Sequence, residues 1–304
     1  MFFEKEQRAM NLFYQNPPRY ESVRQHLAAC RRNFKQVRLF TAGKSVLGRK
    51  LYAVGIGNMK NAVLYAGGIH AQEWITTSLL LRFFDELCTE GEMYGVQLAD
   101  IWENRGLIVL PLCNPDGVEI ALGGSKTARH LSGLVEQMQA QSERSWQANA
   151  RGVDLNHNFD AGFSQLRKME EESGITGPGP RQYGGKLPGS EPETRAIMSV
   201  CIGLNVKKVF AYHSQGEEIY YNYGENTPAN ARLLADALAA CSGYQVCKPE
   251  GLASHGGLKD WFIQTMGRPG FTIEVGKGEN PLPITDLDSI YQKLRELMLI
   301  GILI

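Results

Sequence analysis

Residues 63–74 read VLYAGGIHAQEW, and this stretch decides the fold of the 304-residue chain. It opens with four apolar residues, as a buried strand does, and the two glycines that follow end that strand. Residues 75–88 then have the apolar density and the length of a helix. His70 and Glu73 therefore lie in a short connection between a strand and a helix. Ligands of open α/β sheets bind at the carboxyl ends of strands, which is where both residues are expected.

The same arrangement recurs twice further along the chain. The apolar run 208–212 leads directly into His213, and the run 270–273 leads directly into Glu274. Residues 36–40 and 50–56 alternate in polarity around a glycine-containing turn, which predicts a hairpin. Helices are predicted at 22–34, 191–204, 229–241 and 286–299. This alternation of strands and helices predicts an α/β layered fold with a largely parallel sheet.

Composition excludes several classes of partner. Lys and Arg together number 32, as do Asp and Glu, so the formal net charge is zero and no basic field attracts nucleic acid or anionic lipid. The apolar run 297–304 is far shorter than the roughly 20 residues that span a bilayer, so we expect no membrane segment. The sequence before the first predicted helix lacks the pattern of a signal peptide, and the six cysteines form no CxxC pair. We therefore expect a cytoplasmic protein with reduced, mostly buried thiols.

The polar residues at the three strand ends fit one kind of chemistry. Two imidazoles and one carboxylate, here His70, Glu73 and His213, form a catalytic zinc set that leaves a fourth position for water. Zinc lowers the pKa of that water to about 7, and a nearby carboxylate can take its proton and pass it to a leaving amine. Glu274 is the candidate for this general base. An HxxE pattern alone arises by chance, so the hypothesis depends on all four residues falling at strand ends.

Several segments around these residues resemble one known family. They are the segments 67–74, 114–117, 153–159, 212–214 and 271–274. In this order they are similar to motifs of the M14 zinc carboxypeptidase family, and the resemblance covers about residues 40–300. It implies a three-layer α/β/α sandwich with an eight-stranded, mixed and largely parallel sheet, and one Zn²⁺ ion. Residues 1–40 are then expected to form an N-terminal helical extension packed on a catalytic domain of residues 41–304.

Further roles follow from the resemblance, position by position. Asp154 is expected to accept a hydrogen bond from His70 and so to fix its tautomer. Asn156 is expected to contact the carboxylate or backbone of the substrate. Residues 114–117, NPDG, match a substrate-side turn. The Gly- and Pro-rich stretch 174–190 is predicted to be a surface loop, and long loops of this kind often border binding sites.

Two positions depart from the carboxypeptidase pattern. Ordinary carboxypeptidases have an arginine after the residue matching Asn156, and its planar fork grips a terminal carboxylate, whereas this chain has His157. The family also has an arginine that stabilises the oxyanion where this chain has Gln147, an amide without a charge. Arg144 or Arg151 is an alternative for that role.

The replacement by His157 resembles the branch of γ-D-glutamyl-diaminopimelate peptidases. By the family match, Lys259 points into the pocket for the residue after the scissile bond, where a cation suits a carboxylate-bearing side chain. His255, beside a glycine pair, is a candidate for substrate contact. His26 and His130 are expected at the surface.

These features predict a zinc metallopeptidase that hydrolyses the γ-D-glutamyl–meso-diaminopimelate bond of peptidoglycan stem peptides, with a peptide as its partner. Cytoplasmic placement favours recycling of cell-wall fragments. One alternative is a metallocarboxypeptidase of ordinary peptides, in which His157 and its neighbours hold the terminal carboxylate. A second is an amidase or deacylase of small acylated amino acids. A third is a non-catalytic peptide-binding module, which the presence of all three ligands and Glu274 disfavours.

Overall fold

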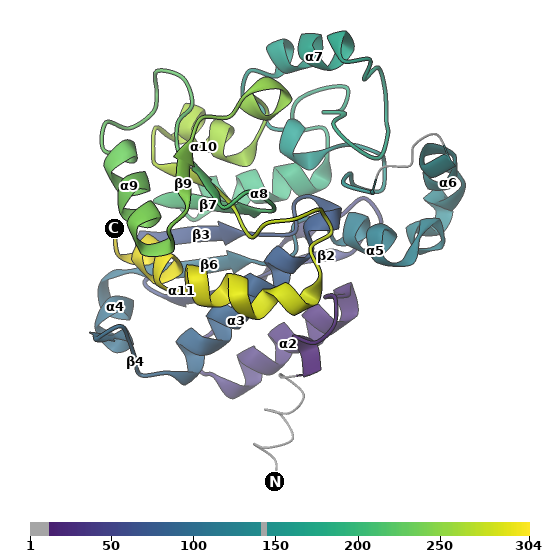
Figure 1. Ribbon diagram of the computed structural model, residues 1–304. Coiled ribbons are helices and arrows are strands. Elements are labelled where there is room, and N and C mark those ends of the chain that lie inside the picture. The colour runs from purple at the N-terminus through teal and green to yellow at the C-terminus, as the bar shows by residue number, and fades with distance from the viewer. Residues whose placement is uncertain (1–11, 141–144) are drawn as a thin grey trace.

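A central mixed sheet organises the molecule. The computed structural model describes residues 12–140 and 145–304, and within these ranges eight strands form one sheet in the order β1-β2-β6-β3-β7-β10-β8-β9 (Figure 1). The strands are β1 (Arg38–Lys44), β2 (Lys50–Gly57), β3 (Ala62–Ala66), β6 (Gly106–Leu110), β7 (Lys208–His213), β8 (Glu218–Tyr220), β9 (Gln245–Cys247) and β10 (Gly270–Glu274). A separate two-stranded ribbon pairs β4 (Glu92–Met93) with β5 (Val96–Gln97).

Strand direction divides the sheet into a parallel centre and antiparallel flanks. The four central strands β6, β3, β7 and β10 run parallel. The hairpin of β1 and β2 joins one side antiparallel, and β8 joins the other side antiparallel to β10, with β9 parallel to β8. This confirms the predicted eight-stranded, mixed and largely parallel sheet. Because the central strands are parallel, their carboxyl ends meet at one edge.

Helices cover both faces of the sheet. They are α2 (Tyr20–Asn33), α3 (Ile75–Thr89), α4 (Leu98–Asn104), α5 (Pro115–Gly123), α6 (Ser132–Ala140), α7 (Phe163–Glu172), α8 (Pro192–Gly203), α9 (Ala231–Ser242), α10 (Leu258–Met266) and α11 (Leu287–Leu303). In Figure 1, α2, α3 and α11 lie on one side of the sheet and α8 and α10 lie on the other. No helix within the described ranges combines the length and apolar character needed to cross a membrane.

Two hydrophobic cores, one on each face, hold the layers together. The larger core joins α2, α3, α9 and α11 to the sheet, and the second joins α8 and α10 to the opposite face. Successive side chains of a strand point to opposite faces, so a central strand such as β3 must be apolar throughout. All five residues of β3 are buried, with Leu64 in one core and Tyr65 in the other. Burial of β3 on both faces of the sheet therefore explains the uninterrupted apolar run in the sequence.

The NPDG segment at 114–117 is a helix start, and its interpretation as a turn was wrong. Asn114 caps α5, and its side chain accepts a hydrogen bond from the Gly117 backbone N–H. Pro115 occupies the first turn of that helix, where its missing N–H costs nothing. The same residues that favour a turn also favour a capped helix. The apolar residues after the segment decide between the two.

The N-terminal segment packs against the sheet, but its boundary remains a prediction. Helix α2 contributes Val23 and Leu27 to the larger core. Residue 40 lies inside β1, which pairs along its length with β2, so the proposed division at 40/41 falls within a strand. His26, expected at the surface, is buried, and this expectation was wrong. His130 is exposed as expected, and the six cysteines are free thiols.

Candidate metal centre and active site

Three side chains converge at the carboxyl edge of the parallel strands. His70 follows β3, Glu73 ends the short 3-10 helix Ala71–Glu73, and His213 is the last residue of β7. Glu73 joins the two histidines, because its Oε1 lies 2.8 Å from His70 Nδ1 and its Oε2 lies 2.9 Å from His213 Nδ1. The parallel pairing of β3 with β7 brings these segments together, although 143 residues separate the two histidines along the chain.

The geometry of these groups fits a single cation. The two Nδ1 atoms lie only 3.1 Å apart, and the ligand atoms of all three residues lie within 4.8 Å of one another. Burial alone would raise the pKa of Glu73, but His70 and His213 lower it to about 2, so this group is a carboxylate. Two imidazole nitrogens and a carboxylate aimed at one point are the donor set of a catalytic zinc site.

Asp154 fixes the orientation of His70, and Gln147 in turn fixes Asp154. Asp154 Oδ1 lies 3.2 Å from His70 Nε2, and Gln147 Nε2 donates to Asp154 Oδ2 at 2.8 Å. The backbone N–H groups of Asn156 and Gln182 also donate to this carboxylate. The structure therefore brings Asp154 to its predicted position. Gln147 is hydrogen-bonded to Asp154 in the structure, and its role in stabilising the oxyanion stays a prediction.

Glu274 lies beside the metal ligands at the end of β10. It pairs in register with His213 of β7, so the two side chains emerge on the same face of the sheet. Burial, and to a smaller extent the carboxylates of Glu73 and Glu218, raise the pKa of Glu274 well above its ordinary value, while His70 opposes them. A carboxylate that takes up a proton readily, next to a nucleophile, has the property required of a general base.

His157 is held by a second carboxylate. Its Nδ1 lies 3.0 Å from Glu170 Oε1 on α7 and 2.9 Å from the Gln182 carbonyl. Burial would lower the pKa of His157, but Asp154 and Glu170 raise it above its ordinary value. His157 is thus a buried imidazole whose charged form is favoured, and its contact with substrate stays a prediction.

Asn156 contacts the start of α10, the helix that carries Lys259. Asn156 Oδ1 accepts a hydrogen bond from the Leu258 backbone N–H at the start of this helix. Lys259 is buried and forms an ion pair with the adjacent Asp260, and its Nζ also donates to the Asn222 carbonyl at 2.8 Å. The Lys259 charge is therefore compensated within the chain, and its contact with substrate stays a prediction.

His255 lies on the segment before α10. Its Nδ1 is 3.2 Å from the hydroxyl of Tyr223, and the two rings meet edge to face. The Lys259 ammonium lies 5.7 Å from the centre of the same Tyr223 ring. The structure thus gathers His255 and Lys259 around Tyr223, separate from the three metal ligands. Tyr223 carried no motif and was not predicted.

Arg181 was not singled out from the sequence. It lines a polar hollow of about 320 Å³ together with Gln72, Gln215, Glu279 and Asn280; Gln72 precedes the ligand Glu73, and Gln215 lies two residues after His213. Its buried Nε has no hydrogen-bond partner among the described residues. Arg181 is the only arginine of the 174–190 loop, and that was the available signal.

Arg151, one of the two arginines proposed as alternatives to Gln147, is half exposed, with its Nη1 3.4 Å from Glu191. Arg144, the other, lies outside the described residues, and the choice of the group that stabilises the oxyanion stays a prediction. The 174–190 loop does border the site, because the Gln182 backbone N–H donates to the Asp154 carboxylate and the Asp154 backbone N–H donates to the Tyr183 carbonyl.

A histidine–glutamate–histidine donor set at the strand ends of a three-layer α/β/α fold fits the class of mononuclear metallohydrolases. Comparison of the sequence with protein families places the chain within that class. The family described as zinc carboxypeptidase matches residues 23–297, and the chain belongs to this family of zinc metallopeptidases.

The chain is also similar to individual proteins. The chain is 34% identical to gamma-D-glutamyl-L-diamino acid endopeptidase 1 of Lysinibacillus sphaericus, over 86% of this chain and 66% of the relative. It therefore spans about two thirds of that relative's length. Among solved structures, carboxypeptidase A of Helicoverpa armigera superposes with a TM-score of 0.73 at 20% identity, covering 95% of this chain and 73% of that one. Murein-tripeptide amidase MpaA of Escherichia coli O157 superposes with a TM-score of 0.52 at 20% identity, covering 84% and 91%. At such identities the two structures show the shared fold.

Proposed function

We propose that this chain hydrolyses the γ-D-glutamyl–meso-diaminopimelate bond of peptidoglycan stem peptides. The observation that carries the proposal is the replacement of the carboxylate-gripping arginine by His157, buried against Glu170, beside a complete metal centre. The 34% identical relative, whose name gives a γ-D-glutamyl-L-diamino acid as its target, supports the same substrate class.

The residues divide the reaction among them. His70, Glu73 and His213 would hold zinc, which when bound supplies a Lewis acid that polarises a carbonyl and activates water. Glu274 takes a proton from the attacking water and delivers it to the leaving amine of the diamino acid. Asp154 keeps His70 in one orientation through its contact with Nε2, and Gln147 keeps Asp154 in place.

Arg181 supplies the cation that binds a carboxylate of the substrate. The peptide L-Ala-γ-D-Glu-meso-DAP carries several carboxylates, and the chain lacks the arginine of ordinary carboxypeptidases at position 157. Arg181 lines a hollow large enough for part of a ligand, and its buried Nε has no hydrogen-bond partner among the described residues. A charge-assisted hydrogen bond there would add affinity and position the scissile bond.

The direct test is hydrolysis of L-Ala-γ-D-Glu-meso-DAP by the zinc-loaded protein, with products identified by mass spectrometry. We expect free meso-diaminopimelate and L-Ala-D-Glu, and no turnover of the blocked dipeptide hippuryl-Phe. Hydrolysis of hippuryl-Phe with the tripeptide left intact would instead identify a carboxypeptidase of ordinary peptides. Products that retain the γ-glutamyl–diaminopimelate link would refute the proposal.

Replacement of Arg181 tests its place in substrate binding. We expect Arg181→Ala to raise KM for the tripeptide at least about tenfold, because a charged hydrogen bond contributes roughly 1.5–3 kcal/mol. Zinc content should stay at the wild-type level. Lys186→Ala on the same loop is the matched control, since Lys186 is exposed and should leave KM unchanged. An unchanged KM in Arg181→Ala would remove Arg181 from the site.

A further inference from the structure

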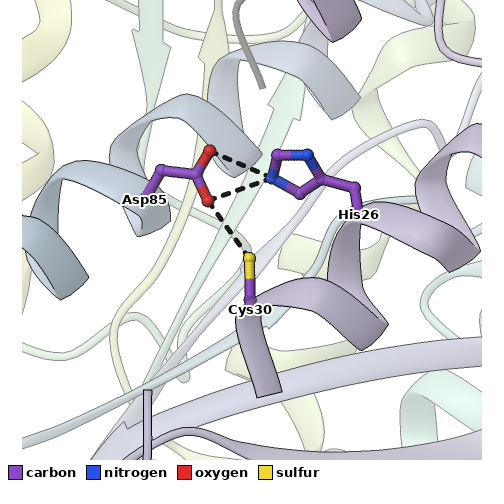
Figure 2. Close-up of side chains that lie close together, drawn as sticks. All are labelled: His26, Cys30 and Asp85. Carbon is purple, nitrogen blue, oxygen red and sulfur yellow. Dashed lines mark hydrogen bonds and ion pairs between the residues drawn. The ribbon is translucent and has the colours of Figure 1, made fainter. Parts of the chain in front are cut away.

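A second cluster of metal-ligating side chains lies away from the active site, between α2 and α3. Figure 2 shows its three members, His26 and Cys30 from α2 and Asp85 from α3. His26 Nε2 lies 3.0 Å from the Asp85 carboxylate, and Cys30 Sγ lies 3.3 Å from Oδ1 of the same group. All three are buried, with at most 7% of each residue exposed. The helices that carry the cluster, α2 and α3, contribute apolar side chains to the larger core on one side of the sheet.

A fourth potential ligand atom, the hydroxyl oxygen, comes from Tyr14. Its hydroxyl donates a hydrogen bond to Asp85 Oδ2 and lies 3.5 Å from His26 Nε2. The phenol, the imidazole and the thiol thus all approach one carboxylate. A hollow of about 420 Å³ borders His26, which gives a small ion a route to the cluster.

The spacing of these residues explains why the donors converge. His26 and Cys30 are four residues apart on α2, so their side chains lie one above the other on the same face. That face packs on α3, where Asp85 is buried among apolar neighbours. An isolated carboxylate is costly to bury, and three donors from separate turns of the chain compensate for it.

The arrangement is unsuited to nucleophilic catalysis. In a cysteine–histidine pair the imidazole must contact the sulfur to take its proton, whereas here Asp85 contacts both groups. Burial, together with Asp85, raises the pKa of the Cys30 thiol far above its usual range, so the sulfur is a protonated thiol while no cation is bound. A buried, protonated thiol is a poor nucleophile.

We propose that Tyr14, His26, Cys30 and Asp85 form a second site for a divalent transition metal such as Zn²⁺. Ligand atoms of a tetrahedral zinc site lie about 3.3–3.7 Å apart. In this cluster the Asp85 carboxylate lies 3.0 Å from His26 Nε2 and 3.3 Å from Cys30 Sγ, and the ligand atoms of these three residues all lie within 4.8 Å of one another. On binding, Cys30 releases its thiol proton to solvent and coordinates through sulfur. His26 coordinates through Nε2 with its proton on Nδ1, and Asp85 coordinates as a carboxylate. Tyr14 keeps its proton, hydrogen-bonded to Asp85 Oδ2, and coordinates as a neutral phenol.

Such an ion would connect the N-terminal segment to the catalytic part of the fold. Helix α3 begins two residues after Glu73, so the cluster anchors the helix that follows the active-site ligand. Metal ligation contributes directly to folding free energy. We therefore expect a structural role for this ion. The proposal does not depend on the substrate of the active site.

Cobalt(II) distinguishes the two sites, because only one of them contains a sulfur ligand. The full-length His213→Ala variant, in which the active-site set is broken, is titrated with Co²⁺ and its absorption spectrum is recorded. We expect a thiolate-to-cobalt charge-transfer band in the near ultraviolet that saturates at one equivalent. Wild-type protein should bind two equivalents of Zn²⁺ after dialysis, measured by elemental analysis.

Cysteine variants in the His213→Ala background assign the sulfur. Cys30→Ala should lose the band, and Cys88→Ala, which removes a buried cysteine of the larger core, should keep it. If Cys30→Ala fails to fold by circular dichroism, His26→Gln replaces it as the variant expected to weaken the band. Absence of the band in His213→Ala at saturating Co²⁺, or a band that survives in folded Cys30→Ala, would overturn the proposal.

Discussion

At the residue scale, the active site depends on where single carboxylates lie. Glu73 contacts both histidines and has a lowered pKa, whereas Glu274 faces them from the next strand and has a raised one. The difference follows from their partners, because burial acts on both groups and only Glu73 touches two imidazoles. One carboxylate of the site therefore favours its ionised form, and the other takes up a proton readily. The first is suited to be a metal ligand and the second to carry a proton.

Replacement of Glu274 tests this division of roles. We expect Glu274→Gln to lower kcat by about 10²–10⁴, since the amide cannot accept the proton of water. Zinc content, measured by elemental analysis, should remain at the wild-type level because Glu274 is not a ligand.

Glu218→Gln is the matched control. Glu218 pairs opposite Glu274 in the adjacent strand β8, and its carboxylate accepts the hydroxyl of Tyr220. Because Glu218 is the smallest of the causes that raise the pKa of Glu274, this variant should retain kcat within a fewfold of the wild type. A Glu274→Gln enzyme with undiminished kcat would exclude Glu274 as the base.

At the scale of elements, α11 must approach the sheet closely for the larger core to close. Gly301 faces two aromatic residues of the central strands, Tyr65 on β3 and Phe210 on β7. A Cβ atom at position 301 would lie 2.4 Å from the Tyr65 hydroxyl and 3.0 Å from Phe210 Cζ. The absence of a side chain at Gly301 therefore sets the distance between the last helix and the sheet.

We expect Gly301→Ala to destabilise the fold by about 1–3 kcal/mol, as overpacking of a core does. This is opposite to the gain that alanine normally gives over glycine within a helix. Urea unfolding followed by circular dichroism measures the change.

Gly203→Ala at the end of α8 is the control for Gly301→Ala, since nothing lies within 4 Å of its added Cβ. It should be neutral or slightly stabilising. Equal stability changes in the two variants would show that Gly301 has no packing role.

At the scale of the whole molecule, a buried carboxyl makes stability depend on pH. Glu193 begins α8 and accepts a hydrogen bond from the Val46 backbone N–H in the hairpin turn, so it joins two distant parts of the chain. Burial raises its pKa to about 7, and the Val46 hydrogen bond opposes that shift in part. The native state thus retains a proton that the unfolded chain loses near its ordinary pKa of about 4.3.

The sign of the effect follows from this difference. Because the folded pKa is raised, the Glu193 contribution to stability is complete below about pH 4.3 and is lost as pH rises through 7. We compare the free energy of unfolding of Glu193→Gln with that of wild type. We expect this difference to shift in favour of the variant by up to about 3 kcal/mol between pH 4 and pH 8. Urea unfolding of both proteins across this range isolates Glu193, since all other groups titrate in both. A stability difference that does not change with pH would contradict the expectation.

The sequence by itself determined the central strands, the order of the metal ligands and the position of Glu274. These are local features: an apolar run predicts a strand buried on both faces, and a polar residue directly after it lies at the strand end. Parallel pairing then brings His70, His213 and Glu274 to one edge without further information. Asp154, assigned by resemblance to the family, also lies where it was expected.

Only the tertiary structure decided which partners the remaining polar residues have. Gln147 donates to Asp154, Lys259 pairs with Asp260, and Arg181 lines a polar hollow. His26, which sequence placed at the surface, contacts a carboxylate 59 residues away. Burial, charge compensation and side-chain direction depend on contacts between segments that are distant in sequence. The local pattern of residues does not encode those contacts.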